Sequence, residues 1–158
     1  MAGSHSGILI RPAVAVDSAA LARLRYEFRA SIAAAAESEA AFLERCTAWM
    51  GERLRPGATW RCWVAQVSEA IVGSAWLQLI EKLPNPVAEP ELHGYISSLY
   101  VQPAHRGAGL GSLLLAACLG ECQARAVDAA ILWPTPRSRS LYLRHGFAVH
   151  DDLMERRG

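Results

Sequence analysis

The chain has 158 residues, enough for one compact domain with a real core and too few for two domains of ordinary size. Hydrophobic residues make up 52% of the sequence, which excludes a disordered chain, and 16 basic against 15 acidic side chains leave a formal net charge of +1. Because so balanced a chain produces no broad electrostatic field, we expect neither nucleic acid nor a membrane as a partner.

The first half of the chain predicts a strand, two helices and a β-hairpin. Asp17 precedes an alanine- and leucine-rich stretch and is a good N-cap for the first helix. The second helix stops at Arg55-Pro56-Gly57, and the apolar residues then take the alternating period of strands, with a turn at Ser68-Glu69. In chain order we expect a strand at 8–11, helices at 18–34 and 37–54, and antiparallel strands at 60–67 and 70–80.

The second half alternates strands with helices. A proline-punctuated loop over residues 82–90 separates it from the hairpin. In chain order we expect a strand at 92–101, a glycine-rich turn, a helix at 110–126, a strand at 129–133, a helix at 135–144 and a closing strand at 147–154. Since no repeat and no long linker divides the chain, we predict one domain over residues 8–157, an α/β fold with the order β-α-α-β-β-β-α-β-α-β.

The cysteines predict neither a disulfide framework nor a metal site. There are four, Cys46, Cys62, Cys118 and Cys122, with no C-x-x-C pair and no histidine accompanying the last two. We therefore expect buried thiols, no metal and a reducing, cytoplasmic setting. Residues 1–7 lack the apolar run of a signal peptide, and we expect a flexible N-terminus of the kind that expression tags leave.

The glycine-rich turn before the second-half helix predicts an anion-binding site. Glycines at 107, 109 and 111 let the backbone curl tightly and turn successive N–H groups toward one point. The helix that follows adds unpaired N–H groups and the positive end of its dipole. Arg106 adds a full positive charge beside them. The segment therefore predicts a cradle for a phosphate or pyrophosphate.

Several readings of this turn compete. A P-loop requires Lys and then Ser or Thr after the last glycine, whereas Gly111 is followed by Ser112 and Leu113. A dinucleotide fingerprint requires G-x-G-x-x-G, whereas the spacing here is G-x-G-x-G. A glycine-rich turn that binds nothing is the third reading.

Two motifs carry a resemblance to a known family. Arg106-Gly107-Ala108-Gly109-Leu110-Gly111 resembles the [Q/R]-x-x-G-x-[G/A] motif of the GCN5-related N-acetyltransferases, and Leu99 to Pro103 looks like the strand that leads into it. Downstream, residues 138–147 look like the family's helix that ends in L-Y-x-x-x-G-F. The beginning, Ile10-Arg11-Pro12-Ala13, is also similar. The resemblance covers residues 8–155.

The resemblance implies a fold, a co-substrate and a binding site. The expected fold is a mixed, mostly antiparallel central sheet flanked by helices, with strands that splay to form a cleft. Acetyl-CoA is the expected co-substrate, an amine the acceptor, and a homodimer the expected assembly. The implied cofactor-binding residues are Leu99, Tyr100, Val101, Arg106, Gly107, Ala108, Gly109, Leu110, Gly111, Ser112, Thr135, Ser138 and Tyr142.

The resemblance also implies catalytic roles. Tyr142 falls on the tyrosine that donates to the coenzyme A sulfur, so it is the expected general acid. Family members often carry a base at the positions occupied here by Ser97 and Tyr95, neither of which is a useful base near neutral pH. Our hypothesis is a water relay from these positions toward His93 or Glu91, which lie on the same strand face by alternation.

The function these features imply is acetyl-CoA-dependent transfer of an acetyl group to a primary amine of a small molecule or peptide. The alternative is a CoA-binding module with weak or no transfer, which the missing base favours. For the acceptor side, the candidates are Tyr26, Phe28, Trp49, Trp60, Trp76 and the loop 84–90, with Glu27 as a carboxylate for a cationic amine. Aromatics at such positions more often serve core packing than ligand contact, and a solvated helix face accounts equally well for Glu27.

Overall fold

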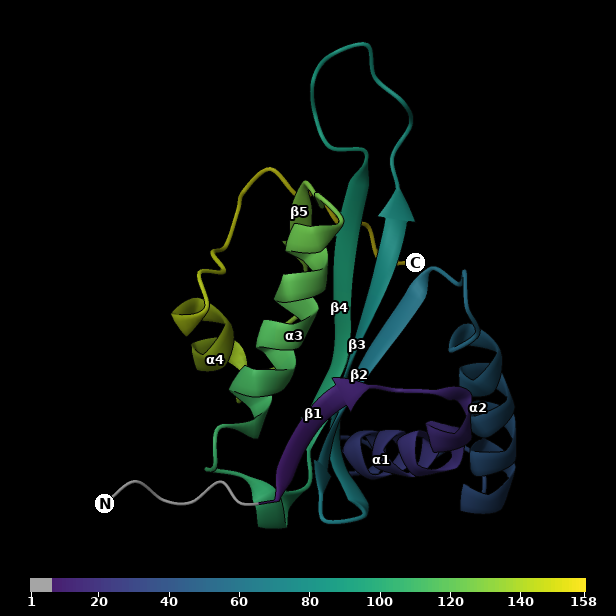
Figure 1. The fold of residues 1–158 in the computed structure, drawn as a ribbon. Helices are drawn as coiled ribbons and strands as arrows, with labels where there is room; N and C mark the ends of the chain where they lie inside the picture. Colours follow the sequence, from purple (N-terminus) through teal and green to yellow (C-terminus); the bar gives the residue numbers. More distant parts are fainter. Residues whose placement is uncertain (1–6) are drawn as a thin grey trace.

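The computed structural model describes residues 7–158 (Figure 1). Residues 1–6, on which most of the expected flexible N-terminus falls, lie outside the described residues. Gly7 is described, and its carbonyl accepts a hydrogen bond from the Ser68 N–H at 3.2 Å. This bond joins the residue before the first strand to the turn of the hairpin.

The elements follow the predicted order as far as the last helix. In chain order they are β1 (Ile8–Pro12), η1 (Ala15–Asp17), α1 (Ser18–Ala30), α2 (Glu39–Arg53), β2 (Trp60–Val67), β3 (Ala70–Glu81), β4 (Leu92–Val101), η2 (Pro103–His105), α3 (Leu110–Ala124), β5 (Ala129–Ile131) and α4 (Arg139–Arg144). The bounds of β2 and β4 are those predicted. Both strands are β-rich runs with clear loop or turn signals at their ends.

The sheet has five strands in the order β1-β2-β3-β4-β5. Neighbours from β1 to β4 are antiparallel, whereas β5 is parallel to β4 because α3 carries the chain back along the sheet. Figure 1 shows α1 and α2 on one side of the sheet and α3 and α4 on the other. The expected mixed, mostly antiparallel sheet flanked by helices is confirmed.

The core lies in two layers on the two faces of the sheet. Strand β3 contributes to both because its side chains alternate: Leu77 packs beneath α3, whereas Trp76 packs beneath α1 and α2. Leu114 from α3 and Leu21 from α1 are almost completely buried in their respective layers. Each such side chain stabilises the fold by about 1.5–3 kcal/mol. The two layers fix β4, which carries much of the site.

The predicted closing strand at 147–154 is wrong, because the structure contains no strand in that segment. Phe147 packs against Tyr142 with ring centroids 5.6 Å apart, and the chain then continues as an exposed coil. Beyond α4, hydrophobic residues such as Val149 and Met154 are exposed, so the alternating hydrophobic pattern of this segment does not correspond to a buried strand face.

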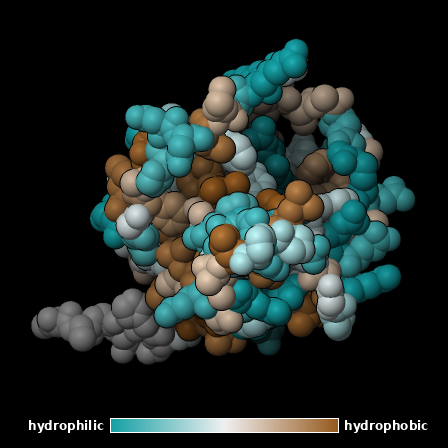
Figure 2. Space-filling view, turned by 90° about the horizontal axis from the view of Figure 1, so that it is seen from above, coloured by the Kyte–Doolittle hydropathy of each residue, from teal (hydrophilic) through white to brown (hydrophobic). Residues whose placement is uncertain are grey.

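In Figure 2 hydrophobic and hydrophilic surface is interspersed, with more of the hydrophobic surface on the side of α3 and α4.

Two local predictions near α1 also need correction. Asp17 makes no capping bond to α1; its carboxylate instead accepts from the Val14 N–H at 2.8 Å and pairs with Arg11 at 2.8 Å. Helix α1 ends at Ala30 rather than at residue 34, and the Ser31 hydroxyl donates to the Phe28 carbonyl at 2.7 Å. The side chains of Asp17 and Ser31 thus bond locally outside the helix ladder.

All four cysteines are free and buried, as predicted. Burial raises the pKa of the Cys62 and Cys118 thiols, so both are held in the neutral form. Within residues 7–158, no group of three or more histidine, cysteine or acidic residues is arranged to hold a metal ion. Over the same residues, no helix combines the length and the hydrophobicity needed to cross a membrane.

Candidate active site

The site begins where β4 and β5 separate. Their parallel pairing runs from His93 opposite Ala129 to Tyr95 opposite Ile131 and goes no further, although β4 continues to Val101. Beyond Tyr95 no described strand pairs with this edge of β4. A cavity of about 1050 Å³ lies there, lined by residues of α1, β4, α3 and α4 and by the turns that lead into the last two. The splayed strands expected from the resemblance are therefore present.

A bulge shapes the part of β4 that lines this cavity. The pairing with β3 shifts between Ser74, opposite Tyr100, and Trp76, opposite Ser97. Ser98 takes a left-handed conformation, with φ of +53°, which is uncommon for a residue with a side chain. The irregularity lies beside the open edge, and all residues from 95 to 101 line the cavity.

The glycine-rich turn forms the floor of the cavity at the N-terminus of α3. Gly107 and Gly109 have φ of +82° and +79°, a conformation that favours glycine, and Gly109 is the N-cap of α3. Gly111 lies inside the helix, where an added Cβ would meet Leu141 Cδ2 at an ordinary 3.5 Å. In the described chain, no backbone carbonyl accepts from the N–H groups of residues 107–112. The turn thus offers the anion cradle predicted from its sequence.

Most of the predicted cradle residues line the cavity. They are Arg106, Gly107, Gly109, Leu110, Gly111 and Ser112, together with Leu99, Tyr100 and Val101 of β4. Ala108 does not line it. The structure therefore brings the turn and the open strand edge to one cavity, as the resemblance implies.

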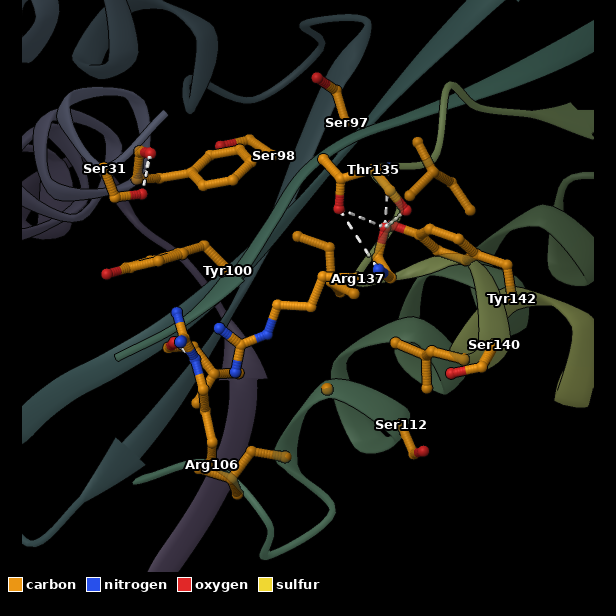
Figure 3. Close-up of a pocket in the computed structure, with 18 of the residues that line it drawn as sticks. Ser31, Ser97, Ser98, Tyr100, Arg106, Ser112, Thr135, Arg137, Ser140 and Tyr142 are labelled. Carbon is orange, nitrogen blue, oxygen red and sulfur yellow. Dashed lines mark hydrogen bonds between the residues drawn. The ribbon is translucent and has the colours of Figure 1, made fainter. Parts of the chain in front are cut away.

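Two arginines converge near Tyr100 beside the cradle. Arg106 Nε donates to the Val101 carbonyl at 2.8 Å, and its Cζ lies 5.5 Å from the centroid of the Tyr100 ring. In Figure 3, Arg137 extends toward the same region from the other side of the cavity. Burial and Glu27 raise the pKa of Tyr100, against the opposing effect of the two arginines. Arg137 was not predicted as a site residue, since no motif marks it.

Thr135 and Ser138 hold the turn that leads into α4. The Thr135 N–H donates to Ser138 Oγ at 2.9 Å, and the Ser138 N–H donates to Thr135 Oγ1 at 3.3 Å. These reciprocal bonds close the turn over residues 135–138. The N–H groups of Ser138 and Arg139 both donate to the Thr135 carbonyl and form a turn. The regular helix α4 begins directly after it, at Arg139. Both residues line the cavity.

Tyr142 lies on α4 with its ring between the core and the cavity. Its side chain is 8% exposed, and Figure 3 shows it pointing from α4 toward Thr135. Burial raises the pKa of the phenol above its ordinary value, and the Ser138 hydroxyl offsets this only in part. The phenol is therefore protonated near neutral pH and is available as a donor at the cavity wall.

Comparison with known proteins assigns the family to which these features belong. The sequence profile of the acetyltransferase (GNAT) family matches residues 23–147. The chain belongs to the GNAT acetyltransferase family. No curated protein sequence matches the chain significantly.

Solved structures of GNAT acetyltransferases and related proteins share the fold. A GCN5-related N-acetyltransferase from Ralstonia eutropha JMP134 has a TM-score of 0.78 at 28% identity, covering 95% of this chain and 98% of that one. A predicted acetyltransferase from Clostridium acetobutylicum, solved with acetyl-CoA, has a TM-score of 0.75 at 22% identity, covering 95% and 96%. An acetyltransferase from Trypanosoma brucei has a TM-score of 0.69 at 24% identity, covering 95% and 99%.

This GNAT-family chain does not bring the expected base residues to its cavity. Neither His93 nor Glu91 lines it, although Tyr95 and Ser97 of the same strand face do. His93 Nδ1 is buried without a hydrogen-bond partner in the described chain. Glu91 is exposed at the end of the preceding loop, where it accepts a weak bond from the Asn85 N–H at 3.4 Å. The two residues thus lie in different environments outside the cavity.

The residues at the expected acceptor side of the cavity differ from the aromatic set suggested by the sequence. Trp49, Trp60 and Trp76 pack against one another, with centroids 5.4–6.1 Å apart. Trp76 is buried in the core layer beneath α1 and α2, Trp60 packs against that layer, and Trp49 is exposed at the surface of α2. Neither they, nor Tyr26, nor the loop 84–90 line the cavity, whereas Phe28 does. Residues that line this end and were not predicted for it are Arg25, Arg29, Ile32, Tyr95 and Trp133.

Proposed function

We propose that this GNAT-family protein transfers the acetyl group of acetyl-CoA to a primary amine of a small molecule or peptide. One observation carries the proposal: the cradle at the start of α3, the unpaired edge of β4 and the Tyr142 side chain all line one cavity. A phosphate anchor, a strip of free backbone groups and a proton donor are the parts that a CoA thioester needs.

The cradle is the proposed site of the CoA pyrophosphate. Its free N–H groups and the α3 dipole favour an anion by about 0.3–1 kcal/mol, and by up to ~2 kcal/mol where the site is partly buried. Arg106 and Arg137 add positive charge beside it. The pantetheine arm would then run along β4, bonding to the main chain of Leu99 to Val101 as an additional strand would.

Tyr142 is the proposed donor to the leaving group. The amine nitrogen attacks the thioester carbonyl, the tetrahedral oxyanion collapses, and the C–S bond breaks with the electron pair on sulfur. The buried, protonated phenol donates a hydrogen bond or its proton to that thiolate, whose conjugate acid has a pKa of about 8.5 by analogy with cysteine. A main-chain N–H at the β4 bulge is the proposed donor to the oxyanion.

The amine must lose a proton, and no carboxylate among residues 7–158 lines the cavity to take it. We propose that water carries the proton outward past Ser97 and Tyr95 toward His93. The unpartnered, buried Nδ1 of His93 and its place on the same face of β4 support this route. Glu91 is the outer alternative. An acceptor that reaches the site already partly neutral would need less help.

Two measurements test the proposal in order. Calorimetry should show acetyl-CoA binding, with much weaker binding of ATP and NAD, since the turn lacks the P-loop lysine and the dinucleotide spacing. A thiol-release assay over a panel of amines should then show amine-dependent turnover. Binding without turnover on any amine would favour the CoA-binding module, the alternative that the missing carboxylate supports. Failure to bind acetyl-CoA would contradict both functions.

A further inference from the structure

The acceptor end of the cavity is basic. Arg25 and Arg29 on α1 line it, and no aspartate or glutamate of the described chain does. A site built for a cationic or polycationic amine would place carboxylates there, because opposite charges attract across a low-dielectric cavity. Arg25 and Arg29 instead repel a second positive charge on the acceptor.

Arg25 lacks an acidic partner within the described chain. None of the ion pairs among residues 7–158 includes it. Its Nη1 donates only a long bond to Ser98 Oγ at 3.4 Å, and its Cζ lies 5.9 Å from the Phe28 ring centroid. Burial and the neighbouring Arg29 lower the pKa of its guanidinium, as expected of a cation that no anion compensates.

The acidic residues of α1 and of the loop that follows it bond elsewhere. Glu27 accepts from Gln102 Nε2 at 3.1 Å and 3.3 Å, and Glu37 pairs with Arg45. Arg25 is therefore half-buried, cationic and open to the cavity, and most of its N–H donors have no partner within the described chain. A planar guanidinium in this condition is suited to a carboxylate, which it can bind with two parallel hydrogen bonds.

The position of Arg25 relates this charge to the reacting centre. Ser98, its hydrogen-bond partner, is the bulge residue of β4, beside the main chain proposed to hold the thioester. An anion on Arg25 would therefore lie close to the amine under attack. The remaining side chains at this end include Ile32 and Trp133, both more than half exposed. They offer apolar surface to the rest of an acceptor.

We propose that the acceptor is a small amine that also carries an anionic group, bound by Arg25 with support from Arg29, and an apolar body. An amino acid with an apolar side chain is the simplest molecule of this kind. A phosphate close to the amine offers the same charged oxygens, and the test below separates the two. This inference rests on the proposed function, since it names the substrate class of the same cavity.

The test compares matched acceptors in the thiol-release assay. Phenylalanine, phenylalaninamide and phenethylamine share the apolar body and differ in the anionic group; phosphoethanolamine and ethanolamine form the phosphate arm. We expect at least about tenfold higher kcat/KM for phenylalanine than for its amide. This preference would run against intrinsic reactivity, because the amide's amine is the less basic and is more fully neutral at a given pH.

Variants assign the preference to Arg25. In Arg25→Gln the acid-to-amide ratio should fall toward one, mainly through KM, with acetyl-CoA binding retained. Arg25→Lys should retain part of the ratio, because the charge stays while the planar fork is lost. Arg23→Gln is the matched control, since Arg23 lies on α1, is exposed and does not line the cavity. Thermal unfolding of each variant separates misfolding from lost recognition.

Each outcome decides a different claim. Selectivity for phosphoethanolamine over ethanolamine that Arg25→Gln abolishes would support the anionic acceptor with phosphate as its group. Higher kcat/KM for phenethylamine or phenylalaninamide than for phenylalanine, with no selectivity in the phosphate arm, would overturn the inference and leave the acetyltransferase function standing. Acetyl-CoA binding with no turnover on any amine would overturn both.

Discussion

Arg106 Nε donates to the carbonyl of Val101 at 2.8 Å, so the first residue of the glycine-rich turn is bonded to the last residue of β4. The bond crosses η2, which lies between the two residues. It holds the phosphate cradle in register with the strand edge along which the pantetheine arm is proposed to run. The two halves of the proposed CoA site are thereby coupled through one guanidinium.

Substituting Arg106 should therefore weaken acetyl-CoA binding in two steps. Arg106→Lys keeps the charge but loses the planar Nε donor to Val101, and Arg106→Ala loses both. A charge-assisted hydrogen bond contributes about 1.5–3 kcal/mol, so we expect Kd to rise by about tenfold or more in Arg106→Ala and by less in Arg106→Lys. Calorimetry measures both values, and equal Kd values for all three proteins would contradict the coupling.

The glycines of the turn should respond unequally to alanine. Gly109 has φ of +79°, so Gly109→Ala should cost about 1–2 kcal/mol through backbone strain and should also weaken acetyl-CoA binding. Gly111 lies within α3 with room for a Cβ, so Gly111→Ala should be neutral or stabilising by up to about 1 kcal/mol. Denaturant unfolding with calorimetry checks both. A larger loss of stability in Gly111→Ala than in Gly109→Ala would contradict the backbone conformations assigned to these two glycines.

Tyr142→Phe should lower kcat while changing the KM for acetyl-CoA little. A positioned general acid contributes about 10²–10⁴-fold, and we expect a loss near the lower end because water can replace part of the donation. The pKa of Tyr142 is raised, so the phenol loses its proton only in strongly alkaline solution. The kcat of the wild-type protein should therefore decline in that pH range. That decline should disappear in Tyr142→Phe. An unchanged kcat would remove Tyr142 from the mechanism.

The relay predicts different pH profiles for two neighbouring substitutions. His93→Ala should lower kcat/KM near neutral pH, and activity should recover in alkaline solution, where the amine is neutral without help. Glu91→Gln tests the outer alternative, and since Glu91 is exposed in the loop beyond the strand, we expect a smaller change in its profile than in that of His93→Ala. Steady-state rates over a pH series measure both. Superimposable profiles for all three proteins would show that water alone accepts the proton.

The Arg11–Asp17 pair should make stability depend on pH. Arg11 holds the pKa of the Asp17 carboxyl below its ordinary value, so the paired form is present above the unfolded pKa of about 3.9, and its stabilisation is lost as the pH falls through the folded value. Asp17→Asn should lower the free energy of unfolding at pH 7 by about 1–3 kcal/mol. The variant should also lose part of the acid dependence.

Glu52→Gln is the control for this prediction. It removes the exposed pair with Arg53, and such pairs contribute about 0–1 kcal/mol. Urea unfolding at pH 7 and pH 3 measures all three proteins. Equal stability of Asp17→Asn and wild type at pH 7 would contradict the role assigned to the pair.

Local sequence signals predicted the parts of this protein that depend on local chemistry. The bounds of β4 and the positive φ at Gly107 and Gly109 follow from strand residues and glycines that admit few alternatives. The segment 147–154 was predicted to be a strand because alternation shows a face that can be buried, without showing whether a partner edge exists. In this chain none of the described strands pairs with it.

The acceptor end could not be predicted, since it depends on which faces of distant elements meet. Arg25 and Arg29 have the spacing of an ordinary solvated helix face, and only the packing of α1 against the sheet places both at the cavity. In the same way, Trp49, Trp60 and Trp76 have the composition of a ligand pocket, but they pack against one another away from the cavity, with Trp76 in the core and Trp49 at the surface. The motif around Tyr142, by contrast, predicted a residue of the site, and Tyr142 does line the cavity.

The most direct test of acetyl transfer is mass spectrometry of the acceptor after incubation with acetyl-CoA. For wild-type protein with the amine preferred in the thiol-release panel, we predict a product heavier by one acetyl group on the amine nitrogen, formed in proportion to the CoA released. Tyr142→Phe should form the same product more slowly. Release of CoA with free acetate and no acetylated amine, at any pH at which the protein stays folded, would contradict the account.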